Sequence, residues 1–84
     1  MGGEYKIRAI TDNPDAYAGL SLAGVHCQQA NTPDALLQAL AGMCRDTGLV
    51  IITSTLAAKS AAMLERYREK NPLPMLVIIP EEGA

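Results

Sequence analysis

The sequence has 84 residues, which corresponds to one domain with a small core. Apolar residues make up 49% of it, but Phe and Trp are absent, so the core must be built mainly from aliphatic side chains. The net charge of −2 argues against nucleic acid as a partner, because nucleic-acid binders carry a basic surface. No apolar run approaches the roughly 20 residues that span a bilayer, and the N-terminus lacks the features of a signal peptide. We therefore expect a single cytoplasmic domain over residues 1–84, without direct membrane insertion. Residues 1–4 are expected to be flexible or added by cloning.

The N-terminal segment predicts a strand followed by a short helix. Tyr5–Ile10 is the strand, with two basic residues interrupting its apolar side. Asn13-Pro14-Asp15 has the residue types of a helix start: a cap, a proline in the first turn, and an acid near the positive end of the helix dipole. The helix is expected to end at Gly24, because glycine readily takes the left-handed conformation that terminates helices.

A second strand and helix follow. Val25–Ala30 is too polar for a central strand, so we expect it at an edge of the sheet. Thr32-Pro33-Asp34 repeats the pattern of cap, proline and acid. The apolar face of this second helix is predicted to consist of Leu36, Leu37, Leu40 and Cys44.

The C-terminal half contains two short apolar runs, Leu49–Ile52 and Met75–Ile79, which are rich in β-branched residues. Such runs are typical of parallel strands that are covered on both faces. Between them, Leu56–Lys70 is predicted to be one helix, capped by Ser54 or Thr55. Its buried face is predicted to contain Leu56, Ser60, Met63, Leu64 and Tyr67.

This alternation predicts an α/β fold: a small doubly wound parallel sheet of four strands with three crossover helices. A polar second strand at an edge gives the strand order 2-1-3-4. Right-handed crossovers then place the first helix alone on one face of the sheet and the other two on the opposite face. On the side of the first helix, the third and fourth strands are left uncovered.

An uncovered apolar sheet face next to an apolar edge strand predicts a partner site or self-association. Strand alternation puts either Met75, Val77 and Ile79 or Leu76 and Ile78 on this face, and the uninterrupted apolar run leaves both possibilities open. Arg66 and Arg68 are further candidates for partner contact, because they could steer an acidic partner.

The strand order reverses between the first and third strands, where doubly wound domains bind ligands. The loops there supply Asp12, Asn13, Ser54 and Thr55. These residues could hold an anion at two helix N-termini, or they could simply cap those helices.

The sequence predicts no catalytic residue, cofactor or metal. It has no phosphate-binding loop and no nucleophile paired with a base, and its single histidine, His26, lies in the expected edge strand. Cys27 and Cys44 lack metal-ligand spacing, and we expect both to be reduced and not bonded to each other.

The order of these segments resembles the F subunit of V-type and archaeal-type rotary ATPases. The similarity extends from Tyr5 to Gly83. In the first half of the chain, the resemblance rests on four stretches: Asp12 with Pro14-Asp15, Gly19-Leu20, Leu22–Val25 and Thr32–Asp34. In the second half, it rests on Asp46–Thr53 and on Leu64–Lys70, which is followed by Pro72, Pro74 and Pro80.

The resemblance implies a non-catalytic subunit of the central stalk. Such a subunit binds the coiled-coil D subunit, turns with the rotor beneath the catalytic A and B subunits, and helps to couple or regulate ATP turnover and ion transport. It would be peripheral to the membrane, as part of the complex.

Two features depart from the family. Its members usually continue into a C-terminal tail with its own helix, whereas this sequence stops at Ala84. Leu20-Ser21 stands where an aromatic and a basic residue often follow the glycine. Two alternatives remain open: a non-catalytic, receiver-like signalling or adaptor domain, and an enzyme domain that binds a small anion. A catalytic receiver is disfavoured because Thr53 occupies the position of the phosphoacceptor carboxylate.

Overall fold

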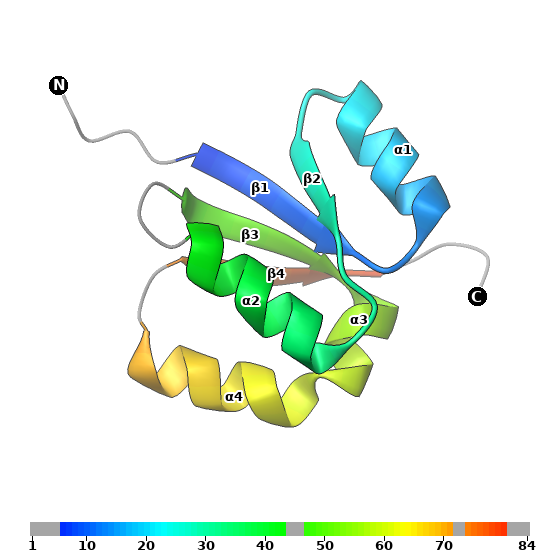
Figure 1. The fold of residues 1–84 in the computed structure, drawn as a ribbon. Helices are drawn as coiled ribbons and strands as arrows, with labels where there is room; N and C mark the ends of the chain where they lie inside the picture. Colours follow the sequence, from blue (N-terminus) through cyan, green and yellow to red (C-terminus); the bar gives the residue numbers. More distant parts are fainter. Residues whose placement is uncertain (1–5, 44–46, 72–73, 81–84) are drawn as a thin grey trace, which may run out of the picture.

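The protein forms a parallel sheet with helices on both sides (Figure 1). The computed structural model describes residues 6–43, 47–71 and 74–80. The strands are β1 (Lys6–Thr11), β2 (His26–Gln29), β3 (Thr47–Thr53) and β4 (Met75–Ile79). The helices are α1 (Pro14–Leu22), α2 (Pro33–Met43), α3 (Ser54–Lys59) and α4 (Ala61–Lys70). The four strands lie in the order β2-β1-β3-β4 and all neighbours are parallel, which confirms the predicted sheet.

Both ends of α1 are fixed by local sequence, as predicted. The side-chain Oδ1 of Asn13 accepts a hydrogen bond from the backbone N–H of Asp15 at 2.8 Å. At the other end Gly24 takes a φ of 90°, in the region that favours glycine. The chain then turns so that the N–H of Val25 donates to the carbonyl of Leu20 at 3.0 Å, which closes a Schellman-type end.

The second helix begins as predicted but buries a narrower face. Thr32 Oγ1 accepts from the N–H of Ala35 at 3.1 Å and so caps α2. Leu36 and Leu40 are fully buried, whereas Leu37, which was predicted to share their apolar face, is 41% exposed. Leu37 lies only one residue from Leu36, which rotates it toward solvent in a helix that packs along one narrow stripe. Cys44 lies outside the described residues.

The prediction of a single helix over Leu56–Lys70 was wrong, because the helix is interrupted at Ser60 and forms two helices, α3 and α4. Ser60 has φ −116° and ψ 17°, outside the helical region. Figure 1 shows the change of direction between the two helices. Thr53, rather than Ser54 or Thr55, takes the position before α3, and its side chain makes no capping hydrogen bond. Most of the predicted face is nevertheless buried: Leu56, Ser60, Leu64 and Tyr67 are buried, and Met63 is half-buried.

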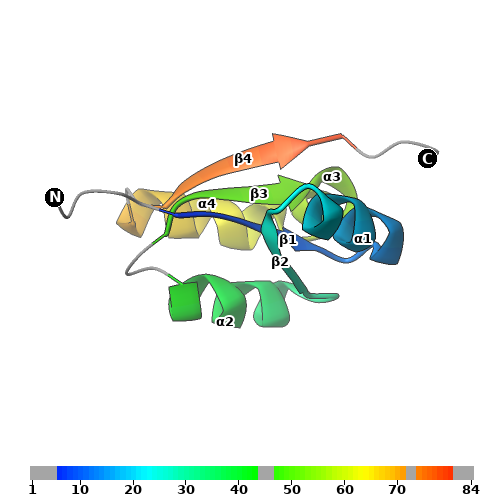
Figure 2. The ribbon, with the colours of Figure 1, turned by 90° about the horizontal axis from the view of Figure 1, so that it is seen from above.

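The core lies between the sheet and the helices α2, α3 and α4. Figures 1 and 2 show these helices on one side of the sheet and α1 on the other. The larger members of the core are Ile10, Leu36, Leu40, Val50, Ile52, Leu56, Leu64, Tyr67 and Leu76. By contrast, no residue of α1 is buried. One side of the sheet is therefore packed and the other is only partly covered.

Candidate functional site

On the less covered side of the sheet, apolar side chains of neighbouring strands lie in rows across β1, β3 and β4. The parallel register aligns Ile7, Leu49 and Met75 across β1, β3 and β4. Because Leu76 belongs to the helix-covered core, strand alternation places its neighbours Met75 and Val77 on the opposite side. We call this surface the open sheet face; it comprises Ile7, Leu49, Ile51, Met75, Val77 and Ile79.

The exposure of this face is greatest at the amino ends of the strands. Met75 is 60% exposed and Ile7 is 53% exposed, while the other members are half-buried. Large apolar side chains exposed in one row of a sheet are unusual in a protein that stays monomeric, and they mark interaction surfaces. The helix α1 packs mainly against β1 and β2, so within the described residues most of β3 and β4 has no helix above it on this side.

The edge of α1 forms a wall along the carboxyl end of the open sheet face. A hollow of about 360 Å³ lies there, between Gly19 and Leu20 of α1 and Thr53, Ile79 and Pro80 near the strand ends. The open sheet face is thus bounded by α1 on one side only. An elongated partner could lie on the sheet and contact α1.

The structure separates the residues that sequence reasoning grouped as partner contacts. Met75, Val77 and Ile79 share the open face, whereas Leu76 is buried in the core and Ile78, which is 45% exposed, points to the helix side. Arg66 lines a groove between α2 and α4, on the helix side of the sheet.

Arg68 lies neither on the open sheet face nor in the groove that Arg66 lines, but next to β4. Its guanidinium donates to the backbone carbonyl of Leu76 at 3.2 Å. It therefore covers part of the free edge of β4, and edge strands commonly need such protection. Arg68 also lines a small hollow with Met75, at the amino end of β4, whereas Arg66 lies on the helix side of the sheet. A role of either arginine in steering a partner stays a prediction.

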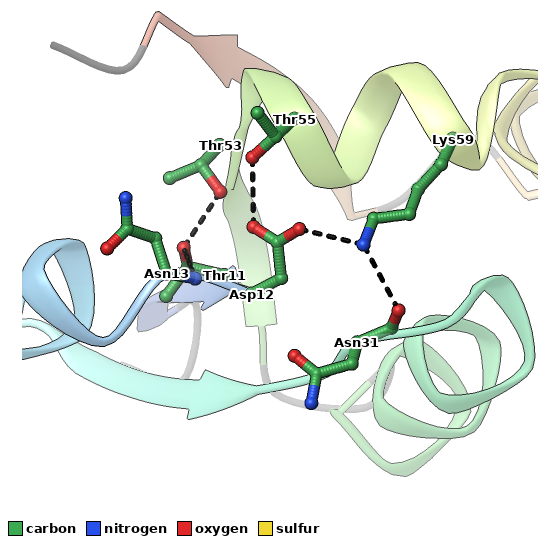
Figure 3. A network of polar contacts seen from close by, with 7 residues as sticks. All are labelled: Thr11, Asp12, Asn13, Asn31, Thr53, Thr55 and Lys59. Carbon is green, nitrogen blue, oxygen red and sulfur yellow. Dashed lines mark hydrogen bonds and ion pairs between the residues drawn. The ribbon is translucent and has the colours of Figure 1, made fainter. Parts of the chain in front are cut away.

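Polar side chains meet at the carboxyl ends of β1 and β3, where the strand order reverses (Figure 3). Thr11 and Thr53 are fully or almost fully buried, and their hydroxyl oxygens are 2.8 Å apart in a hydrogen bond. Thr11 Oγ1 also accepts from the backbone N–H of Asn13 at 3.0 Å. This pair joins the two central strands just where the chain leaves the sheet.

A second set of contacts surrounds Asp12. Its Oδ1 accepts from the hydroxyl of Thr55 at 2.9 Å, and its Oδ2 lies 3.0 Å from Lys59 Nζ. Lys59 Nζ also donates to the backbone carbonyl of Asn31 at 3.3 Å. Figure 3 shows that these contacts connect the end of β1, the helix α3 and the connection from β2 to α2.

Sequence reasoning did not include Lys59 in this site. The spacing could have indicated it, because Thr55 and Lys59 are four residues apart and therefore share a face of α3.

The predicted anion site at the ends of β1 and β3 contains the carboxylate of Asp12, which is itself an anion. Asp12 and Thr55 bond to each other, Asn13 caps α1, and Ser54 is the first residue of α3, which has only 6 residues. Helix capping and an internal ion pair thus use most of these side chains. Anion binding stays a prediction, and the function proposed below does not depend on it.

The remaining candidate side chains lie at the β2 edge of the sheet. His26 is exposed and Cys27 is a half-buried free thiol, whose pKa is raised by burial and lowered in part by a backbone hydrogen bond from Gln28. A raised pKa makes this thiol a poorer nucleophile at neutral pH. Within residues 6–43, 47–71 and 74–80, no three His, Cys, Asp or Glu side chains are placed to hold a metal ion. The helices in that part of the chain are also too short or too polar to cross a membrane.

The sheet order and the half-covered sheet define a small doubly wound α/β domain with an open apolar face. A family model for the ATP synthase (F/14-kDa) subunit matches residues 7–84, so the chain belongs to that family. The fold is similar to the crystal structure of the F subunit of the V-type ATP synthase from Archaeoglobus fulgidus. The TM-score is 0.68 at 21% sequence identity, over 92% of this chain and 99% of that one. No curated protein sequence matches this chain.

Proposed function

We propose that the protein is a central-stalk component of a V/A-type rotary ATPase, where it binds the coiled-coil D subunit and takes no part in the chemistry. It helps to couple or regulate ATP turnover and ion transport, on the cytoplasmic side of the membrane and near the catalytic A and B subunits. Membership of the ATP synthase (F/14-kDa) family supports an assignment to such a complex.

The open sheet face is the observation that supports docking onto a larger partner. Its most exposed row, Ile7, Leu49 and Met75, is apolar and is not covered by any helix within the described residues. A coiled coil is long and straight, and it could lie across these strands while α1 limits its position. Burying such a row would provide a favourable hydrophobic contribution of about 25 cal/mol per Å².

The polar crevice supports a non-catalytic role. Asp12 is paired with Lys59, and Thr11 is paired with Thr53. These contacts use the polar groups at the switch point to hold the fold together, and general acid–base or nucleophilic chemistry would need such groups to be available to a substrate.

The test compares two substitutions on β4 that differ in the face they alter. Met75 and Ile78 are both large, apolar and exposed, at 60% and 45%, but they lie on opposite sides of the strand. We expect Met75→Glu to weaken binding to the D subunit encoded in the same genome by on the order of 2 kcal/mol, because it places a charge in a buried contact. Ile78→Glu is the matched control and is expected to leave binding nearly unchanged. Isothermal titration calorimetry with the two purified proteins measures both affinities.

Binding that is insensitive to Met75→Glu but lost with Ile78→Glu would place the interface on the edge or helix side of β4. Failure of the unaltered protein to bind the D subunit would overturn the proposed function itself. Circular dichroism of both variants checks that the fold is retained.

A further inference from the structure

A second surface lies on the other side of the sheet, in the groove between α2 and α4. The groove has a volume of about 640 Å³. Its lining includes four smaller or apolar residues, Leu37, Ala41, Ala62 and Met63, which we call its apolar floor, and two basic residues, Arg66 and Lys70. We call this the helix groove. It is separate from the open sheet face, because the sheet and its packed core lie between them.

The shape of the helix groove favours a helical occupant. Two helices of the same layer leave a channel between them, and a third helix can pack into such a channel at an interaxial distance of about 8–10 Å. Ala41 and Ala62 are small, so the backbone of an incoming helix could approach closely. Leu37, 41% exposed, and the half-buried Met63 would supply apolar contact. Methionine adapts to different partner shapes.

The charge of the groove favours an acidic occupant. Arg66 and Lys70 are four residues apart on α4, so they project along the same side of the helix. Both are exposed, and among the described residues no acidic side chain lines the groove. Neither residue forms an ion pair within the part of the chain that the structure describes. Two unneutralised cations beside an apolar floor complement an amphipathic helix whose apolar stripe is flanked by Glu or Asp.

We propose that the helix groove binds an acidic amphipathic helix of a partner protein, with the apolar stripe on Leu37 and Met63 and the carboxylates on Arg66 and Lys70. This inference does not rest on the proposed stalk function. With the open sheet face on the other side, the domain would have two docking surfaces and could hold two partners at once.

Two synthetic peptides of about 18 residues, a length at which a helix can form, test the proposal. Both carry a leucine stripe; the first has glutamates beside it and the second has lysines at the same positions. Titration of the isotope-labelled protein, followed by amide chemical shifts, shows where each peptide binds and how tightly. We expect the acidic peptide to shift the signals of Leu37, Ala62 and Arg66, and to bind more weakly at higher salt.

Paired variants separate the groove from general electrostatics. Arg66→Gln with Lys70→Gln makes the net charge more negative by 2, since two positive charges are removed. Gln28→Glu with Gln29→Glu gives the same change on exposed positions of β2. We expect the first pair to weaken acidic-peptide binding by about five- to tenfold, as for two exposed charge contacts, and the second pair to have little effect. Reversal with Arg66→Glu and Lys70→Glu should shift the preference to the lysine peptide.

Three outcomes would overturn the proposal. These are the absence of acidic-peptide binding to the unaltered protein, equal affinity for the two peptides, and shifts confined to residues of the open sheet face. None of them bears on binding of the D subunit, which the substitutions on β4 test separately.

Discussion

At the scale of single residues, the hydroxyl of Thr11 is held by two hydrogen bonds. It bonds to Thr53 at 2.8 Å and accepts from the N–H of Asn13 at 3.0 Å. The two contacts differ in what they hold: the first joins β1 to β3, and the second shapes the turn into α1. Because Thr11 and Thr53 are both buried, the hydroxyl of Thr53 has no easy access to water when Thr11 is replaced.

We therefore predict that Thr11→Val lowers the free energy of unfolding by about 1–3 kcal/mol, because it removes two hydrogen bonds and leaves the buried hydroxyl of Thr53 desolvated. Thr53→Val removes only one contact and should cost about 0.5–1.5 kcal/mol. The double variant should cost less than the sum of the two, since a matched apolar pair no longer leaves a hydroxyl unsatisfied. Urea denaturation of all four proteins gives these values. Equal and additive losses would contradict this account.

At the scale of elements, the break between α3 and α4 is the main departure from the sequence pattern. Ser60 is 2% exposed, and its Oγ has no hydrogen-bond partner within the described residues. A buried hydroxyl without a hydrogen-bond partner lowers the stability of the fold.

We predict that Ser60→Ala raises the free energy of unfolding by about 1 kcal/mol, because it removes a desolvated polar atom while keeping the tight packing at this position. Ser21→Ala in α1 is the control, because Ser21 is exposed and its replacement changes only helix propensity, by a few tenths of a kcal/mol. Thermal and urea unfolding measure both changes. A loss of stability with Ser60→Ala would show that the hydroxyl is needed where it is.

The elements that sequence predicted well are those with local causes. Asn13 and Thr32 cap their helices, and Gly24 ends α1, because each acts through hydrogen bonds or backbone angles within a few residues. The edge position of β2 was also predictable, since its polar residues are unsuited to a central strand.

Features set by the tertiary fold were not predictable in this way. The run Met75–Ile79 is apolar throughout, so alternation alone could not tell which side faces the core. The break at Ser60 depends on how α3 and α4 meet the sheet. Arg66 and Arg68 lie two residues apart on α4 and so point in different directions, but which of them faces the groove and which faces β4 depends on how α4 packs on the sheet.

At the scale of the whole molecule, the two sides of the sheet are unequal. The helix side holds the hydrophobic core, while the open sheet face leaves Met75 and Ile7 largely exposed. Two copies of the domain could cover each other through this face when no partner is present.

We predict weak self-association of the isolated protein, with a dissociation constant on the order of 100 µM or above, because a small apolar row buries little area. Met75→Glu should abolish the association and Ile78→Glu should not, since only Met75 lies on the open face. Sedimentation velocity over a range of concentrations measures it. Addition of a D subunit that occupies the same face should dissociate the self-associated form.

The absence of buried residues in α1 has a consequence for how the domain moves. Tyr17 and Leu22 are 38% and 90% exposed, so this helix is held mainly by its caps and by a few contacts with β1 and β2. Segments with so little buried area open at a free energy well below that of global unfolding, and their amide protons exchange with solvent accordingly. A partner resting against α1 would suppress this opening, and part of its binding free energy would be spent on ordering the helix. Slowed amide exchange in α1 would then report occupancy of the neighbouring sheet, even though the helix itself contributes little to the contact.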